Sequence, residues 1–98
     1  MKRVYISGPI TGTDDYMERF DQAEKELREM GYTSILNPAK VNSNLPEDFT
    51  HKEYMAVSIA ELRQCNVIYL MKGYKESRGA EVEKAFAENK GMEVVYQV

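Results

Sequence analysis

Cysteine and histidine are almost absent from this chain of 98 residues, which contains only Cys65 and His51. A single cysteine excludes an internal disulfide and fits a reducing compartment. One thiol and one imidazole also argue against a structural zinc site, because such a site needs several ligands of these types. We expect Cys65, which lies beside an apolar run, to pack in the core rather than to act as a nucleophile.

Long apolar stretches and an excess of positive charge are missing as well. No apolar run approaches about 18 residues, so we expect no membrane-spanning segment and no membrane partner. The formal net charge is −3, without a basic tract, which argues against nucleic acid as the main partner. The first residues lead directly into a strand-like run rather than a signal peptide. We therefore expect a cytoplasmic protein.

The patterns that are present alternate between strand and helix within a single domain, residues 1–98. Strands are predicted near 2–7, 32–36, 66–71 and 93–97, helices near 14–30, 49–64 and 78–90, and a long loop over 39–49. This alternation is typical of an α/β fold, a small three-layer sandwich of the flavodoxin or Rossmann-like type. The sequence predicts a four-stranded parallel sheet in the order 2-1-3-4.

Polar residues before the helical patterns predict where the helices begin. Thr13 or Asp14 is expected to cap the first helix, Asp48 or Thr50 the second, and Ser77 the third. The third helix follows the most apolar predicted strand, which we expect to lie centrally in the sheet.

The helix after Ser77 carries a carboxylate on its apolar side. At about 100° per residue, one side of this helix presents Gly79, Ala80, Val82, Glu83, Phe86 and Ala87. Glu81 and Glu88 fall on the opposite side, where solvent is expected. A carboxylate that points at the protein body needs a partner, a raised pKa or a cleft. Glu83 is therefore a candidate functional residue, with an ordinary solvated glutamate as the alternative.

The second candidate feature is the segment Gly8–Gly12, called here the glycine turn. A strand, a glycine turn and a helix start together form an arrangement that binds phosphate, but they also begin many α/β domains. The glycines match neither G-x-G-x-x-G nor a P-loop. In a parallel sheet, this turn and the loop before Glu83 both lie at the carboxyl ends of strands. The topology therefore brings the two candidate features together.

The segments Tyr5–Gly12 and Ser77–Glu83 resemble sequences of the nucleoside 2-deoxyribosyltransferase superfamily. The shared patterns are Y-I-x-G-P-x-T-G, an Asn-Pro pair after the second strand, and S-R-G-A-x-x-E. They are typical of a short, uncharacterised bacterial and phage branch, which is related to 2′-deoxynucleoside 5′-monophosphate N-glycosidases. The resemblance covers nearly the whole chain.

The resemblance implies roles for individual residues. Glu83 would attack the anomeric carbon of a deoxyribosyl group, Tyr5 would position it, and Ser77 would help to bind a 5′-phosphate. This chemistry needs carboxylates and a shaped pocket, so we expect no metal and no organic cofactor. The residues expected to bind substrate are Ser7, Gly8, Pro9, Ile10, Thr11, Gly12, Ser58, Ser77 and Gly79.

Several positions depart from the pattern of the superfamily. Active members usually have aspartates where this chain has Ser58 and Asn66, and the first aspartate is thought to protonate the leaving base. The monophosphate enzymes have serine and arginine where this chain has Pro9 and Thr11. The carboxylates left open as replacements for the missing acid are Asp14, Asp15, Glu53 and Glu76.

We expect an enzyme that cleaves or transfers the N-glycosidic bond of a 2′-deoxynucleoside or its 5′-monophosphate. A non-catalytic nucleotide-binding module is one alternative, and a structural or protein-interaction domain with Glu83 as a core carboxylate is another. So small a domain leaves apolar helix surface poorly covered, and members of the superfamily are commonly dimers or larger. We therefore also expect a homodimer or higher homo-oligomer.

Overall fold

Four parallel strands form the sheet at the centre of the molecule, in a computed structural model that describes residues 1–98. The strands are β1 (Arg3–Ser7), β2 (Ser34–Leu36), β3 (Val67–Leu70) and β4 (Glu93–Tyr96), and their order is β2-β1-β3-β4. Tyr5 of β1 lies opposite Leu36 of β2 and Ile68 of β3. The predicted α/β fold, the parallel sheet and the strand order are confirmed.

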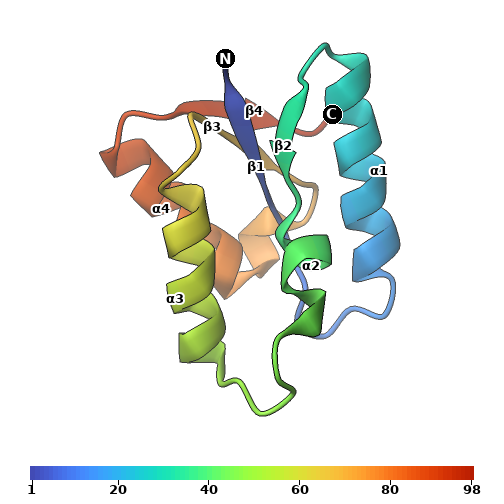
Figure 1. Ribbon diagram of the computed structural model, residues 1–98, viewed down its shortest axis with the longest axis vertical. Helices are drawn as coiled ribbons and strands as arrows, with labels where there is room; N and C mark the ends of the chain where they lie inside the picture. The colour runs from blue at the N-terminus through green and yellow to red at the C-terminus, as the bar shows by residue number, and fades with distance from the viewer.

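Helices cover both faces of this sheet (Figure 1). They are α1 (Tyr16–Glu29), α2 (Pro38–Val41), α3 (His51–Leu62) and α4 (Arg78–Asn89), with two 3-10 turns, η1 (Asn42–Asn44) and η2 (Tyr74–Glu76). α1 packs on one face, while α3 and α4 lie together on the other. None of these helices is both long and apolar enough to cross a membrane.

Alternate side chains of each strand divide the core into two clusters. Val4 and Ile6 of β1 point towards α1, where they share a cluster with Phe20. Tyr5 points the other way and shares a cluster with Leu62 of α3. Because burying a large apolar side chain contributes about 1.5–3 kcal/mol, these clusters hold the helices on opposite faces. Cys65 is buried in the second cluster, as expected.

The N-caps of α3 and α4 agree with the sequence. Thr50 forms a reciprocal capping box with Glu53 at the start of α3. The hydroxyl of Ser77 accepts a hydrogen bond from the backbone N–H of Ala80, at 3.2 Å. Both helices therefore begin at defined residues, and both starts lie near the carboxyl ends of the strands.

The prediction of Thr13 or Asp14 as the cap of α1 is wrong. Asp15 occupies the cap position and makes no side-chain capping bond. The hydroxyl of Thr13 instead donates to the backbone carbonyl of Ile10, at 2.9 Å. The side chain of Thr13 therefore bonds back to the glycine turn and does not cap α1.

The predicted loop over 39–49 is wrong in its first half, where α2 and η1 stand. The side chain of Asn37 accepts a hydrogen bond from the backbone N–H of Lys40, and Pro38 occupies the first turn of α2. Proline is favourable there because its missing N–H has no partner in the first helical turn. A helix of four residues has no apolar periodicity, so the sequence pattern could not reveal it.

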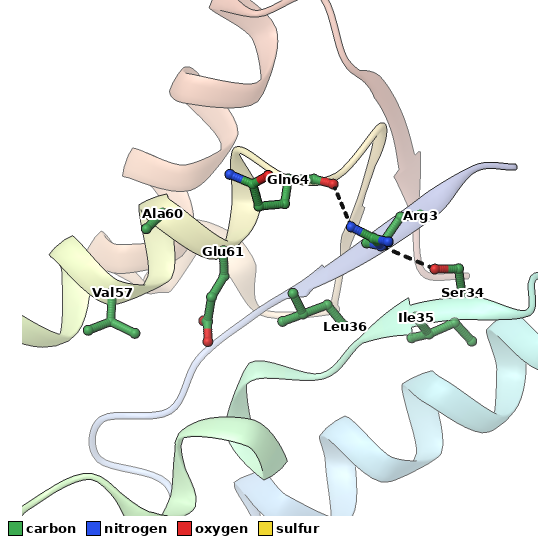
Figure 2. Close-up of a pocket in the computed structure, with 8 residues that line it drawn as sticks. All are labelled: Arg3, Ser34, Ile35, Leu36, Val57, Ala60, Glu61 and Gln64. Carbon is green, nitrogen blue, oxygen red and sulfur yellow. Dashed lines mark hydrogen bonds between the residues drawn. The ribbon is translucent and has the colours of Figure 1, made fainter.

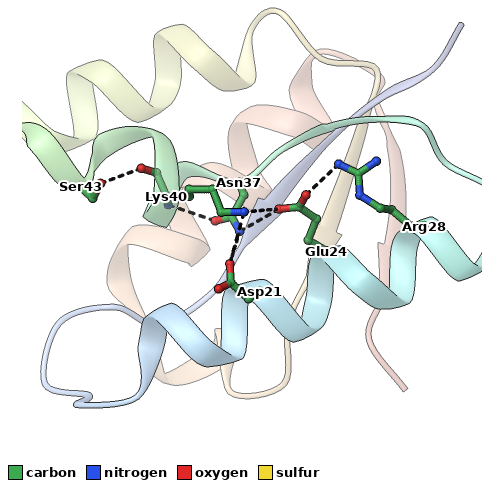
Figure 3. Close-up of polar contacts among 6 residues, drawn as sticks. All are labelled: Asp21, Glu24, Arg28, Asn37, Lys40 and Ser43. Carbon is green, nitrogen blue, oxygen red and sulfur yellow. Dashed lines mark hydrogen bonds and ion pairs between the residues drawn. The ribbon is translucent and has the colours of Figure 1, made fainter.

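Asn37 also ties this segment to α1 (Figure 3). It is buried, and its amide donates to the carboxylates of Asp21, at 3.3 Å, and Glu24, at 3.2 Å. Arg28 donates to Glu24 at 2.8 Å, and the ammonium of Lys40 lies 3.7 Å from it. The network fixes the end of β2 and the start of α2 beside the carboxyl end of β1.

Candidate active site

The carboxylate of Glu83 is held by two hydroxyl groups of β1. Tyr5 donates to Oε2 at 2.7 Å, and Ser7 donates to Oε1 at 2.6 Å. Tyr5 and Ser7 lie two positions apart in one strand, so their side chains point to the same face of the sheet. Only 7% of the surface of Glu83 is exposed. The expected contact with Tyr5 is present, and the bond from Ser7, which we expected to bind substrate, was not foreseen.

The surroundings of Glu83 favour its protonated form. Burial raises the pKa of Glu83 to about 7, although the hydrogen bonds from Ser7 and Tyr5 act to lower it. The charge of Glu61 adds a smaller upward effect, and no lysine or arginine lies within ion-pair distance. Burial, with the charge and hydrogen bond of Glu83, raises the pKa of Tyr5 well above its usual value, so Tyr5 remains a donor.

Glu83 lines a cavity of about 630 Å³, a volume typical of small-molecule sites. The predicted site residues that line this cavity are Tyr5, Gly8, Pro9, Ile10, Thr11, Ser58, Ser77, Gly79 and Glu83. Ser7 does not line it but donates to Glu83. Gly12 does not line it either, and its φ of +81° shows that it serves the backbone turn. The fold therefore brings the glycine turn and the start of α4 together around the carboxylate.

Two of the lining glycines, Gly8 and Gly79, also pack closely against methionine side chains. A Cβ on Gly8 would lie 2.7 Å from Sδ of Met71, which is too close for the backbone to stay in place. A Cβ on Gly79 would lie 3.2 Å from Sδ of Met55, at the contact between α3 and α4. Packing against methionine is therefore a second reason for glycine at these two positions, besides the substrate binding that we expect of them.

The inner face of α3 supplies residues that the sequence reasoning missed. His51 lines the cavity together with Met55 and Ser58, which follow it at helical spacing. The ring of His51 lies 3.9 Å from the position that a Cβ on Gly79 would take, so it stands beside the start of α4. His51 lies four residues before Met55 on the same side of α3, so the apolar pattern that includes Met55 could have pointed to it.

The apolar arc of α4 was predicted with an error at one edge. Val82 is 47% exposed, whereas the buried residues of the helix are Ala80, Glu83 and Ala87. Phe86 is half-buried, so the buried side of α4 matches the predicted arc except at Val82. Glu83 remains in the middle of the buried stripe, and this is the feature on which its selection depended.

Of the carboxylates considered as proton donors, Glu76 alone lines the cavity. Glu53 is engaged in the capping box of α3. Asp15 lies at the start of α1, 4.0 Å from Arg19. Asn66 stands at the amino end of β3, where its side chain accepts a hydrogen bond from the backbone N–H of Arg3, so it has a structural role there. Glu76 and His51 are the carboxylate and the imidazole that line the cavity besides Glu83.

Comparison with known families gives one match, which spans almost the entire sequence. The family described as a domain of unknown function (DUF4406) matches residues 2–96. No match is found among curated proteins. The chain belongs to the DUF4406 family.

Proposed function

We propose that this protein cleaves or transfers the N-glycosidic bond of a 2′-deoxynucleoside or its 5′-monophosphate, with Glu83 as the nucleophile. The observation that carries the proposal is the placement of a buried carboxylate beside a cavity, held by Tyr5 and Ser7 and without a cationic partner. A carboxylate kept only for stability would be expected to have such a partner. The resemblance to nucleoside 2-deoxyribosyltransferases supports the same role.

The chemistry follows from the geometry of the carboxylate. One oxygen of Glu83 forms a bond to the anomeric carbon, while the bond from this carbon to the base nitrogen breaks and its electron pair leaves with the base. Each carboxylate oxygen accepts one hydrogen bond from β1 and keeps a further lone pair for the attack. Water or a second base then displaces Glu83 from the deoxyribosyl group. Tyr5 and Ser7 are proposed as positioning residues that fix the direction of attack.

The rim of the cavity supplies groups for the two ends of a nucleotide. Ser77 uses an oxygen lone pair to cap α4, so its hydroxyl hydrogen stays free to donate to a sugar or phosphate oxygen. Glu76 and His51 are the candidates to protonate the departing base in place of the aspartate that Ser58 replaces. No metal or organic cofactor enters this scheme. The ligand is a small molecule, and we propose that the protein works as a homodimer or higher homo-oligomer.

A non-catalytic nucleotide-binding module is the second candidate, and Ser58 is the observation that favours it. A serine hydroxyl is a poor proton donor to a leaving base, while it can still hydrogen-bond a bound nucleotide. In that case the cavity would sense or sequester the ligand, and the raised pKa of Glu83 would report only its burial.

Incubation with a panel of 2′-deoxynucleosides and their monophosphates tests the proposal. Free base is measured by chromatography, and ligand binding is measured by the shift in melting temperature of the same samples. We expect base release by the wild type. A rise in melting temperature without base release would favour the binding module, and the absence of both effects would overturn the nucleotide assignment.

A further inference from the structure

A second groove, of about 600 Å³, opens beside a different face of α3 (Figure 2). We call it the β2 groove, because the whole of β2 lines one wall and Arg3 lies at one end. The other wall consists of Val57, Ala60 and Glu61, which recur at helical spacing along α3, and of Gln64 just after the end of this helix. None of the residues that line the β2 groove lines the cavity that contains Glu83, so the two hollows are distinct although they lie on neighbouring sides of α3.

The chain itself does not cover this groove. β2 is an edge strand, because it pairs with β1 alone. Leu36 and Val57 are half-buried and Ala60 is exposed, which leaves a strip of small and medium apolar side chains open to solvent. Small side chains on a helix allow a second element to approach closely.

Two opposite charges border the strip, and neither has an ionic partner within the chain. The guanidinium of Arg3 donates to Oγ of Ser34 and to the backbone carbonyl of Gln64, both at 3.2 Å. The carboxylate of Glu61 accepts only from Asn42, at 3.0 Å, and no cation lies within ion-pair distance. Glu61 is half-buried, so its charge is poorly solvated and would gain from a cation placed in the groove.

We propose that the β2 groove is the contact surface between two copies of this chain related by a two-fold axis, with Arg3 of each copy paired to Glu61 of the other. A two-fold contact repeats each interaction, so one surface that carries both charges can complement itself. The apolar strip then packs against its own copy. This inference rests on the proposed self-association and names the surface that produces it, but it does not depend on glycosidic chemistry.

A peptide strand added to the edge of β2 is the competing occupant. The strand is only three residues long, and it is followed by Asn37 and by Pro38, which has no N–H to donate. So short an edge offers few main-chain hydrogen bonds to a peptide. The unpaired charges, in contrast, lie on side chains, which favours a contact made by side chains.

Dimer formation through the β2 groove would also affect the candidate active site, through Asn42. Asn42 donates to Glu61 in the β2 groove and lines the cavity of Glu83. Pairing of Glu61 with the partner's Arg3 would hold the carboxylate, and with it Asn42, in one position. We therefore expect self-association to order one wall of the ligand cavity.

Charge reversal tests the interface directly. Sedimentation equilibrium is measured at micromolar concentration for the wild type, Arg3→Glu, Glu61→Arg and the double variant. We expect the wild type to be a dimer. Each single variant should associate at least tenfold more weakly, because like charges then face each other across the contact. The double variant should regain dimer formation, because each pair is restored with its charges exchanged. Glu81→Arg, on the exposed side of α4, is the control and leaves the dimer unchanged.

Val57→Lys provides a second way to weaken the proposed self-association, because it places a charge in the apolar strip without altering Arg3 or Glu61. Circular dichroism establishes that each variant is folded before its association is measured. A monomeric wild type, single reversals without effect on association, or a double variant that remains dissociated would each overturn the proposed interface. Base release is not measured here, so failure of the interface is distinguishable from failure of the proposed enzyme.

Discussion

The hydroxyl of Ser7 lies 2.6 Å from Oε1 of Glu83, although the two residues are 76 positions apart in the chain. The contact depends on the parallel sheet, which directs the end of β1 towards the first turns of α4. Tyr5, two residues earlier on the same face, binds the other oxygen. One strand thus supplies both hydrogen bonds that hold the proposed nucleophile.

Replacing Ser7 with alanine leaves Oε1 of Glu83 without its donor. Because a hydrogen bond to a buried charged group contributes about 1.5–3 kcal/mol, we expect Ser7→Ala to lower the free energy of unfolding by that amount at pH 8. The pKa of Glu83 rises further, so the pH at which activity is half-maximal moves upward. Thr33→Ala, which removes an exposed hydroxyl outside the cavity, is the control. An unchanged pH profile would argue against the role of Ser7 in positioning Glu83.

The raised pKa of Glu83 predicts how stability depends on pH. Its value in the folded state, about 7, lies above its ordinary value of 4.5, so the folded protein binds the proton more tightly than the unfolded chain. The resulting stabilisation is fully present below pH 4.5 and is lost as the pH rises through 7. We expect Glu83→Gln to remove this dependence of about 3 kcal/mol, measured by urea unfolding between pH 4.5 and 8.5. Equal slopes in wild type and variant would contradict the burial of an ionisable Glu83.

Gly8 tests how closely the glycine turn packs on the end of β3. A Cβ at this position would lie 2.7 Å from Sδ and 2.9 Å from Cβ of Met71. We expect Gly8→Ala to lower the free energy of unfolding by about 1–3 kcal/mol, because the core must shift to admit the methyl group. In a Met71→Ala background the same change costs less, because the contacts with Sδ and Cγ are removed while the contact with Cβ at position 71 remains. Additive effects of the two substitutions would show that Sδ and Cγ of Met71 are not the obstruction.

Asn37 tests the network that joins α1 to α2 (Figure 3). In Asn37→Asp, an amide that donates to Asp21 and Glu24 becomes a carboxylate that faces both of them. We expect the free energy of unfolding to fall by about 3 kcal/mol at pH 7, because a buried donor is lost and like charges meet. The deficit shrinks as the pH falls and the new carboxyl is protonated. Asn44→Asp, at an exposed position, controls for the added charge, and equal losses in both variants would refute this account.

The parts of the site that follow helical and strand periodicity could be predicted from the sequence. Glu83 was found because it interrupts an apolar stripe, and Ser77 because a serine before such a stripe is a common cap. Val82 was misplaced because residues at the edge of an arc are decided by packing neighbours that the pattern does not contain. The bond from Ser7 to Glu83 depends on tertiary contact, and α2 depends on a local cap, so neither has a periodic signal.

Mass spectrometry of the protein after acid quench tests whether Glu83 attacks the sugar. During incubation with a 2′-deoxynucleoside or monophosphate that the wild type cleaves, we expect a covalent deoxyribosyl adduct on the peptide that contains Glu83. The adduct is retained in Glu81→Gln, a change on the exposed side of α4, and is absent from Glu83→Gln, whose amide cannot act as the nucleophile. An adduct that maps to another residue, or that forms equally on Glu83→Gln, would contradict the assignment of Glu83.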